Sequence, residues 1–411
     1  MSSGTRLLVL VLALLSLTGI TLGSTFLEEN VELIEKYGFH AETHRVFTQD
    51  DYILEMHRVA GPKNKPIVKN KPAVLIIHGL LASSAVWVVS GREKSLAFIL
   101  ADAGYDVWLG NCRGSKYSRK HIKLTVRDKE YWDFSWHEIG MYDLPVMIDH
   151  ILEISGQKKL FFIGHSQGTT TFFVMGSMRP AYQDKIKAMF ALAPVAYSSR
   201  MTNPAFRLLS LFTNNLEVNY SRSLNQVIVI LLPAQVAIVI STFRIELQRL
   251  STTLPNILGH VPAGSSTKQF IHYGQIIKSG HFRQFNHGII GNLKAYGKIV
   301  PPPYKLGLIK CPVFLHYSTN DWLAHVRDVH QTYNELGNAV AKFRVPDEKF
   351  NHLDFMWGID AKRFVYDKIL SLMTRNQGTT IDKGIWHQQC FVAECIYLYC
   401  ACQIYFAIII L

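Results

Sequence analysis

Short apolar segments alternate with amphipathic ones over most of the chain. Uninterrupted apolar runs bounded by turn residues predict buried strands. We expect such strands at residues 73–77, 106–109, 160–163, 186–193, 312–316 and 341–345. Apolar residues at helical spacing predict helices at residues 93–103, 136–154 and 169–178. Because strands that alternate with helices form parallel sheets, the pattern predicts an α/β fold with a mainly parallel sheet covered by helices.

This alternation stops between residues 197 and 301, where the chain is long, apolar and helix-like. The most apolar part, residues 227–240, is interrupted by Pro233 and Gln235 and is shorter than the ~20 residues that a membrane-spanning helix needs. We therefore expect an inserted helical cap or lid. The core would then consist of residues 24–196 and 302–376, which fits a chain of 411 residues, longer than one usual domain.

Residues 1–23 have the features of a secretory signal peptide. Arg6 precedes an apolar run over residues 7–17, and small residues follow before Ser24. We expect the mature protein to enter the secretory route and to be secreted or lysosomal. Asn219, in Asn219-Tyr220-Ser221, is then a candidate glycosylation site.

The last segment, residues 377–411, is atypical because it is apolar and rich in cysteine. Three interpretations stay open: a C-terminal membrane anchor, a lipid-anchor signal that is removed, or a non-native end from a gene-model error. The first would make the protein membrane-associated. Mass spectrometry of the mature C-terminus would decide between them.

Charge and cysteine content exclude two other classes of protein. The formal charge of +12 is scattered along the chain, without the basic stripe and interleaved aromatics of a nucleic-acid-binding protein. Cys112 and Cys311 are isolated, and the other four cysteines lie in the last segment. The chain is therefore not a disulfide scaffold, and its core has to provide its stability.

Ser166 is the candidate nucleophile. It lies in Gly164-His165-Ser166-Gln167-Gly168, between the predicted strand 160–163 and the predicted helix 169–178. A strand, a sharp turn and a helix in this order form a nucleophile elbow, in which the flanking glycines leave room for the turn. His165 is expected to be held in this turn and to point away from the nucleophile.

A serine hydroxyl needs a base to take its proton, and in such hydrolases the order along the chain is serine, acid, histidine. His352 follows the strand predicted at 341–345 and is the candidate base. Asp321 follows the strand predicted at 312–316 and is the candidate acid. Asp354 is the rival acid, although it is better suited to cap a helix; Asp143 and Asp149 precede the serine and are in the wrong order.

The oxyanion donors are expected to be backbone N–H groups. His78-Gly79-Leu80-Leu81 follows the strand predicted at 73–77, where the second donor of these hydrolases lies. The candidate donors are therefore the N–H groups of Leu80 and Gln167. This chemistry requires neither a metal nor an organic cofactor.

Several of these segments together resemble the acid lipases, the family of gastric, lingual and lysosomal lipases and their insect relatives. The similarity runs from Asn30 to about Met373 and includes residues 51–54, 78–81, 102–111, 142–145, 164–170, 191–196, 262–266 and 351–355. It implies an α/β-hydrolase core with a helical cap, tolerance of acid, and Ser166, Asp321 and His352 as the triad. The chain departs from the family in lacking a cysteine pair in the cap and in its long last segment.

The predicted function is hydrolysis of neutral-lipid esters, triacylglycerol or cholesteryl ester, at a lipid–water interface. Two alternatives remain: an esterase or thioesterase for more soluble substrates, and a lipid carrier without catalysis. The complete candidate triad disfavours the carrier, and the apolar cap favours a water-insoluble substrate.

Overall fold

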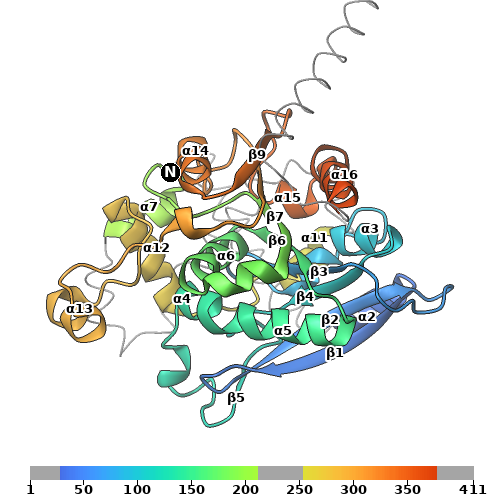
Figure 1. Cartoon of the computed structure of the whole chain (residues 1–411), viewed down its shortest axis with the longest axis horizontal. Helices are drawn as coiled ribbons and strands as arrows, with labels where there is room; N and C mark the ends of the chain where they lie inside the picture. Colours follow the sequence, from blue (N-terminus) through green and yellow to red (C-terminus); the bar gives the residue numbers. More distant parts are fainter. Residues whose placement is uncertain (1–27, 212–252, 377–411) are drawn as a thin grey trace, which may run out of the picture.

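The computed structural model describes residues 28–211 and 253–376 (Figure 1). One sheet of nine strands forms its centre, in the order β1-β2-β4-β3-β6-β7-β8-β9, with β5 paired to β2. The strands are β1 (Phe39–Phe47), β2 (Tyr52–Pro62), β3 (Ala73–Ile77), β4 (Asp106–Gly110), β5 (Lys120–His121), β6 (Leu160–His165), β7 (Ile186–Leu192), β8 (Val313–Tyr317) and β9 (Ala339–Arg344).

The part of the sheet from β4 to β9 is parallel throughout. All six predicted strands occur here, with ends shifted by up to two residues. β1, β2 and β5 add an antiparallel edge that the apolar pattern did not predict. Only some residues of β1 are buried, so its sequence lacks a continuous apolar run. The fold is an α/β-hydrolase fold with a mixed, mostly parallel sheet.

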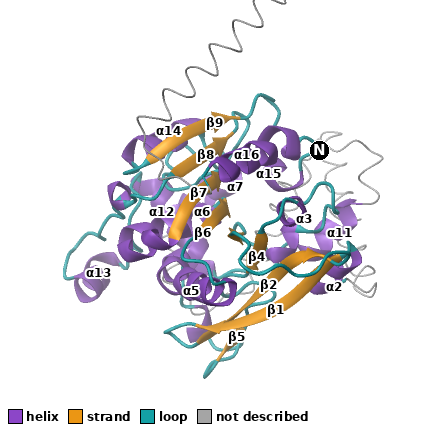
Figure 2. Cartoon of the chain, turned by 45° about the vertical axis from the view of Figure 1, so that its right-hand side comes forward, coloured by secondary structure: helices purple, strands orange, loops and turns teal. Residues whose placement is uncertain are grey.

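Helices cover both faces of this sheet. Figure 2 shows α5 and α6 on one side and α3 and α16 on the other. The helices are α2 (Asn30–Lys36), α3 (Leu96–Asp102), α4 (Trp136–Glu138), α5 (Leu144–Ser155), α6 (Gln167–Met178), α7 (Pro204–Leu211), α11 (Thr253–His260), α12 (Thr267–Ser279), α13 (Gly288–Tyr296), α14 (Val326–Glu335), α15 (Asp354–Trp357) and α16 (Asp367–Arg375).

The helix predicted at 136–154 is interrupted. A π-helical turn, Ile139–Asp143, separates α4 from α5. Gly140 lies in this turn, and a Cβ there would come within 2.6 Å of the carbonyl oxygen of Thr171 in α6. The turn thus allows the chain at Gly140 to approach α6 closely. The two segments in contact are far apart in the sequence, so a local pattern does not reveal the turn. α5 ends at Gly156, whose φ of 67° is left-handed, one to two residues after the predicted end of the helix.

Four described helices, α7, α11, α12 and α13, lie between β7 and β8, where we expected the inserted cap. The division of the chain into core and cap stays a prediction. The signal segment, Asn219, the apolar run 227–240 and the last segment 377–411 lie outside the described residues. In the described part of the chain, no helix combines the length and apolar character that crossing a membrane requires.

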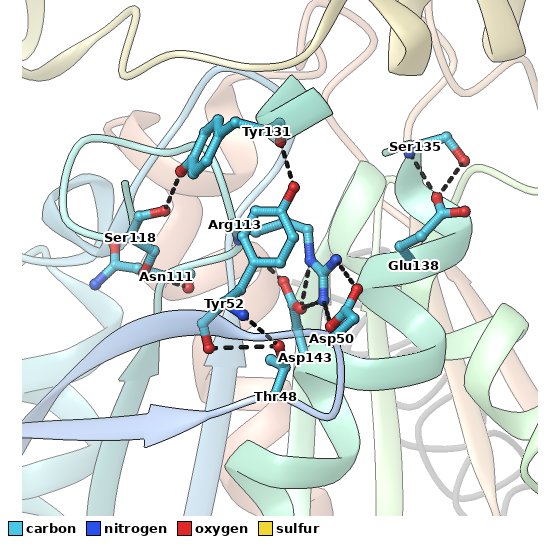
Figure 3. Close-up of polar contacts among 10 residues, drawn as sticks. All are labelled: Thr48, Asp50, Tyr52, Asn111, Arg113, Ser118, Tyr131, Ser135, Glu138 and Asp143. Atoms are coloured by element: carbon cyan, nitrogen blue, oxygen red, sulfur yellow. Dashed lines mark hydrogen bonds and ion pairs between the residues drawn. The ribbon is translucent and has the colours of Figure 1, made fainter. Parts of the chain in front are cut away.

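A buried ion pair fastens the antiparallel edge to the helical layer (Figure 3). Arg113 follows β4, and its side chain is fully buried, as is that of Asp143. The guanidinium binds the Asp143 carboxylate, with Nε 2.7 Å from Oδ1, and also the half-buried Asp50 in the turn between β1 and β2. Its central carbon lies 4.0 Å from the centre of the Tyr52 ring. One side chain therefore connects three segments.

Candidate active site

Ser166 lies in a strained turn between β6 and α6. Its φ of 51° and ψ of −117° are outside the regions that side-chain-bearing residues usually adopt. The turn is held by the Ser166 N–H, which donates to the carbonyl oxygen of Leu192, and by Thr169, whose N–H and hydroxyl donate to that of Ser166. The predicted strand, turn and helix are therefore present, with Ser166 at the strained position of the turn.

The two glycines of the turn explain how β6 and α6 approach so closely. A Cβ on Gly164 would lie 2.8 Å from the carbonyl carbon and oxygen of Gly168. A Cβ on Gly168 would lie 2.5 Å from the carbonyl oxygen of Ile77, at the end of β3. Neither position has space for a side chain, as the sequence motif predicted.

Asp321 and His352 meet across two loops, one after β8 and one after β9. The His352 Nδ1 lies 2.8 Å from Oδ2 and 3.0 Å from Oδ1 of Asp321. Both side chains are buried. An ionised carboxylate only accepts hydrogen bonds, so Nδ1 carries the proton of the neutral imidazole. The His352 Nε2 is then a free base, which is the form that general-base catalysis requires.

The Asp321 carboxylate is held in its charged form. Burial alone would raise its pKa, but the charge and hydrogen bond of His352, with the N–H groups of Ala324 and Leu323, lower the pKa below its ordinary value. Both N–H groups lie 2.8 Å from Oδ1. The acid therefore stays ionised in moderately acidic solution.

Ser166 and His352 line one cavity that is partly open to solvent and measures about 890 Å³ when its open part is counted. The rest of its wall is mostly apolar and comes from the loop after β3, from the segments between β7 and β8, and from the region of α15. These other lining residues are Gly79, Leu80, Leu81, Ala82, His165, Val195, Met201, Phe206, Val261, Tyr273, Leu323, Leu353, Met356 and Trp357. Such a wall suits the hydrocarbon part of an ester.

The loop predicted to supply an oxyanion donor lies against the serine. A Cβ on Gly79 would be 3.1 Å from the Cβ of Ser166, and Leu80 lines the cavity. Gln167 is the first residue of α6, where helix N–H groups have no intrahelical acceptor. The two candidate donors thus flank Ser166 from two different segments.

His165 is the site residue that the sequence reasoning underestimated. We expected only that it is held in the turn and points away from the nucleophile, but it also lines the cavity. Its Nε2 donates to the backbone carbonyl oxygen of His352 across 2.9 Å. Burial is the main cause that lowers its pKa to about 3, so the ring is neutral. Its position next to Ser166 was the only signal in the sequence, and that signal does not reveal the contact with a loop 187 residues further along the chain.

Comparison with known proteins agrees with this geometry. Residues 30–91 match the family model of a partial alpha/beta-hydrolase lipase region, and residues 72–228 match that of the alpha/beta hydrolase fold. Lipase 1 of Drosophila melanogaster is 44% identical over 83% of this chain and 79% of its own length.

Two mammalian proteins are also similar. Gastric triacylglycerol lipase of Bos taurus is 36% identical over 84% of this chain and 91% of its own length. The human lysosomal acid lipase/cholesteryl ester hydrolase is 36% identical over 84% of this chain and 90% of its own length. The chain belongs to the acid lipase family. It is a serine ester hydrolase with an α/β-hydrolase fold.

In this acid lipase, the rival carboxylates have other partners. Asp354 begins α15 and accepts from the N–H of Asn351 at 2.7 Å. Asp143 binds Arg113, and Asp149 binds Tyr182 and Lys185. In residues 28–211 and 253–376, no three His, Cys, Asp or Glu side chains are grouped as a metal site would require.

Proposed function

We propose that this acid lipase hydrolyses the ester bonds of triacylglycerol or cholesteryl ester through an acyl-enzyme on Ser166. The observation that carries the proposal is the meeting of Ser166 with the Asp321–His352 pair in one apolar cavity. The names of its relatives, a triacylglycerol lipase and a cholesteryl ester hydrolase, support these two substrates.

The first half of the reaction forms the acyl-enzyme. The Ser166 Oγ attacks the ester carbonyl carbon while its proton moves to the His352 Nε2. The carbonyl oxygen becomes an oxyanion, to which the N–H groups of Leu80 and Gln167 donate. The oxyanion then re-forms the carbonyl, the bond to the alcohol breaks, and the alcohol leaves with the proton from His352.

The second half restores the enzyme. Water attacks the acyl carbon and gives its proton to His352. The bond between the Ser166 Oγ and the acyl carbon breaks, the proton returns to Oγ, and the fatty acid leaves. Asp321 holds the imidazole in the reactive tautomer and stabilises the imidazolium. The strained backbone of Ser166 and the rigid elbow keep the nucleophile in place through both halves.

The decisive experiment replaces Ser166 by Ala. Turnover of emulsified triolein, cholesteryl oleate and a soluble short-chain ester should fall by up to ~10⁶-fold while the fold is preserved. Asp321→Asn should lower turnover by about 10⁴-fold. Asp354→Asn, the matched control at the start of α15, should retain most activity. Ester hydrolysis that survives Ser166→Ala would refute Ser166 as the nucleophile. A larger loss of turnover in Asp354→Asn than in Asp321→Asn would assign the role of the acid to Asp354 instead of Asp321.

The alternative function is an esterase for soluble substrates. It shares the site and differs only in the substrate admitted. The apolar wall and the segments between β7 and β8 that contribute Phe206, Val261 and Tyr273 favour the lipid. Comparing triolein with the soluble ester ranks the two; a preference for the soluble ester by several orders of magnitude would favour the alternative.

We also propose that the protein enters the secretory route, is secreted or lysosomal, and carries a glycan on Asn219. The pattern of residues 1–23 and the names of the gastric and lysosomal relatives support this route. N-terminal sequencing of the expressed protein should find residue 24 first, and endoglycosidase treatment should lower its apparent mass. An unprocessed N-terminus would contradict the proposal, and mass spectrometry of the C-terminus would establish whether residues 377–411 persist as an anchor.

A further inference from the structure

α13 exposes its apolar side chains and buries a polar one. Asn292 is 1% exposed, whereas Ile289 is 68%, Ile290 83% and Leu293 48% exposed. Figures 1 and 2 both show this helix at one edge of the molecule. A surface helix of a water-soluble domain ordinarily buries its apolar side, so α13 is inverted relative to that rule.

Hydrogen bonds from the side chain of Asn292 hold the helix in this orientation. Its Oδ1 accepts from the N–H of His287 at 2.8 Å, and its Nδ2 donates to the side chain of Asn286 and to the carbonyl oxygen of Ile299. These hydrogen bonds replace the apolar contacts that usually hold a helix. Asn292 thus ties α13 to the chain segments on either side of it without using the apolar side chains.

The chain after α13 extends the same apolar surface. Ile299 and Val300 are 60% and 52% exposed, and the bond from Asn292 holds this segment beside the helix. Residues 289 and 293 are one helical turn apart and share a face with residue 290. We call Ile289, Ile290, Leu293, Ile299 and Val300 the α13 patch. None of the five lines the cavity of the active site.

The chain segment that carries the α13 patch has basic residues and no acidic ones. No Asp or Glu occurs between Glu246 and Asp321 in the sequence. The described part of this stretch has seven basic residues: Lys268, Lys278, Arg283, Lys294, Lys298, Lys305 and Lys310. Lys294 and Lys298 flank the patch and are exposed, and neither forms an ion pair with another described residue.

Two acidic side chains reach this region from another part of the chain. Asp133 and Glu138 are the carboxylates whose charges act on His287, beside α13. Asp133 pairs with Lys268 at 2.7 Å, and Glu138 accepts from the N–H and the hydroxyl of Ser135. Ser135 is uncharged, so Glu138 keeps its negative charge. Lys294 and Lys298 have no acidic partner among the described residues, and this pair of positive charges is complementary to an anionic partner.

We propose that the α13 patch inserts into the surface of an anionic lipid aggregate, with Lys294 and Lys298 against its headgroups. Exposed apolar side chains surrounded by basic ones are what binding in the plane of a lipid interface requires. The proposal deepens the proposed function, because a lipase reaches a water-insoluble ester only at such a surface. A protein partner would need matching acidic and apolar groups; a lipid surface supplies both.

The test measures binding of the full chain to vesicles of phosphatidylcholine with and without phosphatidylserine. We expect tighter binding when phosphatidylserine is present. Ile290→Ser combined with Leu293→Ser should weaken binding to both vesicles by about tenfold or more, because two apolar side chains no longer leave water. Lys294→Glu combined with Lys298→Glu should remove the preference for phosphatidylserine.

Hydrolysis assays connect binding to function. Both variants should retain the native rate on a soluble short-chain ester and lose rate on emulsified triolein. Ile154→Ser is the matched control, since it removes a 46% exposed isoleucine from α5 and should change nothing. Loss of soluble-ester activity in the variant with Ile290→Ser and Leu293→Ser would show that it does not fold. In that case the variant with Lys294→Glu and Lys298→Glu alone tests whether the α13 patch binds lipid.

Three outcomes would overturn the proposal. The first is vesicle binding that is unchanged in the variants, and the second is equal binding of the native protein to both kinds of vesicle. The third is a native dimer that the serine variant converts to a monomer. The first would indicate that another surface, or residues 212–252, makes the lipid contact. The third would assign the α13 patch to a second copy of the chain. Native protein that binds vesicles but hydrolyses no ester would instead refute the proposed function and leave the docking surface intact.

Discussion

The His165 imidazole donates a hydrogen bond from Nε2 to the backbone carbonyl oxygen of His352, 2.9 Å away. The strand that presents the candidate nucleophile is thereby tied to the loop that presents the candidate base. The two rings also lie side by side, with their centres 4.8 Å apart. Because the bond needs the proton on Nε2, it holds His165 in one neutral tautomer, with its buried Nδ1 unprotonated.

Removing this bond should impair turnover more than substrate binding. We expect His165→Leu to lower kcat on a soluble ester by about fivefold, the equivalent of about 1 kcal/mol of lost orientation, with KM little changed. His165→Gln keeps a side-chain N–H donor of similar reach and should recover part of the loss. A Gln variant as impaired as the Leu variant, or an effect on KM alone, would argue against a positioning role.

Gly168→Ala should damage both stability and activity. The added Cβ would lie 2.5 Å from the carbonyl oxygen of Ile77, so the start of α6 must move away from the end of β3. We expect a loss of about 1–3 kcal/mol in the free energy of unfolding and a large fall in turnover, since the candidate oxyanion donor Gln167 precedes Gly168 and the loop of Leu80 follows Ile77. Urea unfolding and ester hydrolysis measure the two effects. Gly307→Ala is the control, because its nearest neighbour would be 3.8 Å away; equal effects at the two positions would contradict the steric argument.

The buried ion pair predicts that replacing Arg113 destabilises the protein more than replacing Asp50 does. Arg113→Met leaves the Asp143 carboxylate buried without a counter-charge and should cost about 3–5 kcal/mol of stability. Asp50→Asn should cost about 1 kcal/mol or less, because that side chain is 32% exposed and water screens the pair. Urea unfolding of each variant tests this order. Combining Arg113→Met with Asp143→Leu should recover much of the loss; a double variant less stable than Arg113→Met would show that the pair is not the cause.

His316, on β8, should make stability depend on pH. Burial first, and then the charge of Lys368, lowers its pKa to about 3, against about 6.5 in an unfolded chain. The unfolded state therefore binds the proton more readily. The stability linked to the neutral ring is fully present above about pH 6.5 and declines as the pH falls towards 3.

We expect His316→Leu to reduce the difference in unfolding free energy between pH 6.5 and 5 by about 2 kcal/mol. Urea unfolding at both values measures it. His281→Gln, which replaces an exposed histidine, should leave the difference as in the native protein. A His316 variant with the native pH dependence would show that this ring is not the group responsible. The protein would then lose less stability in acid than the buried His316 indicates, which would make the acid tolerance implied by the family resemblance easier to explain.

Much of the parallel part of the fold could be predicted from the chain alone. Strands β3, β4, β6 and β7 are continuous apolar runs because they are buried on both faces, and such runs are visible without a structure. The edge strand β1 has no such run and was missed. The π-helical turn between α4 and α5 was missed as well, since it depends on where α6 approaches Gly140.

The sequence by itself determined the elbow around Ser166, because the two glycines, the apolar strand and the helix form a local pattern that has few other interpretations. It also placed Asp321 and His352 after strand ends in the required order. Only the tertiary structure decided that Asp321, rather than Asp354, binds His352, that His165 supports the same loop, and that α13 exposes its apolar side chains. These relationships join residues far apart in the chain, and their distances follow from how the sheet and helices pack, which no local pattern contains.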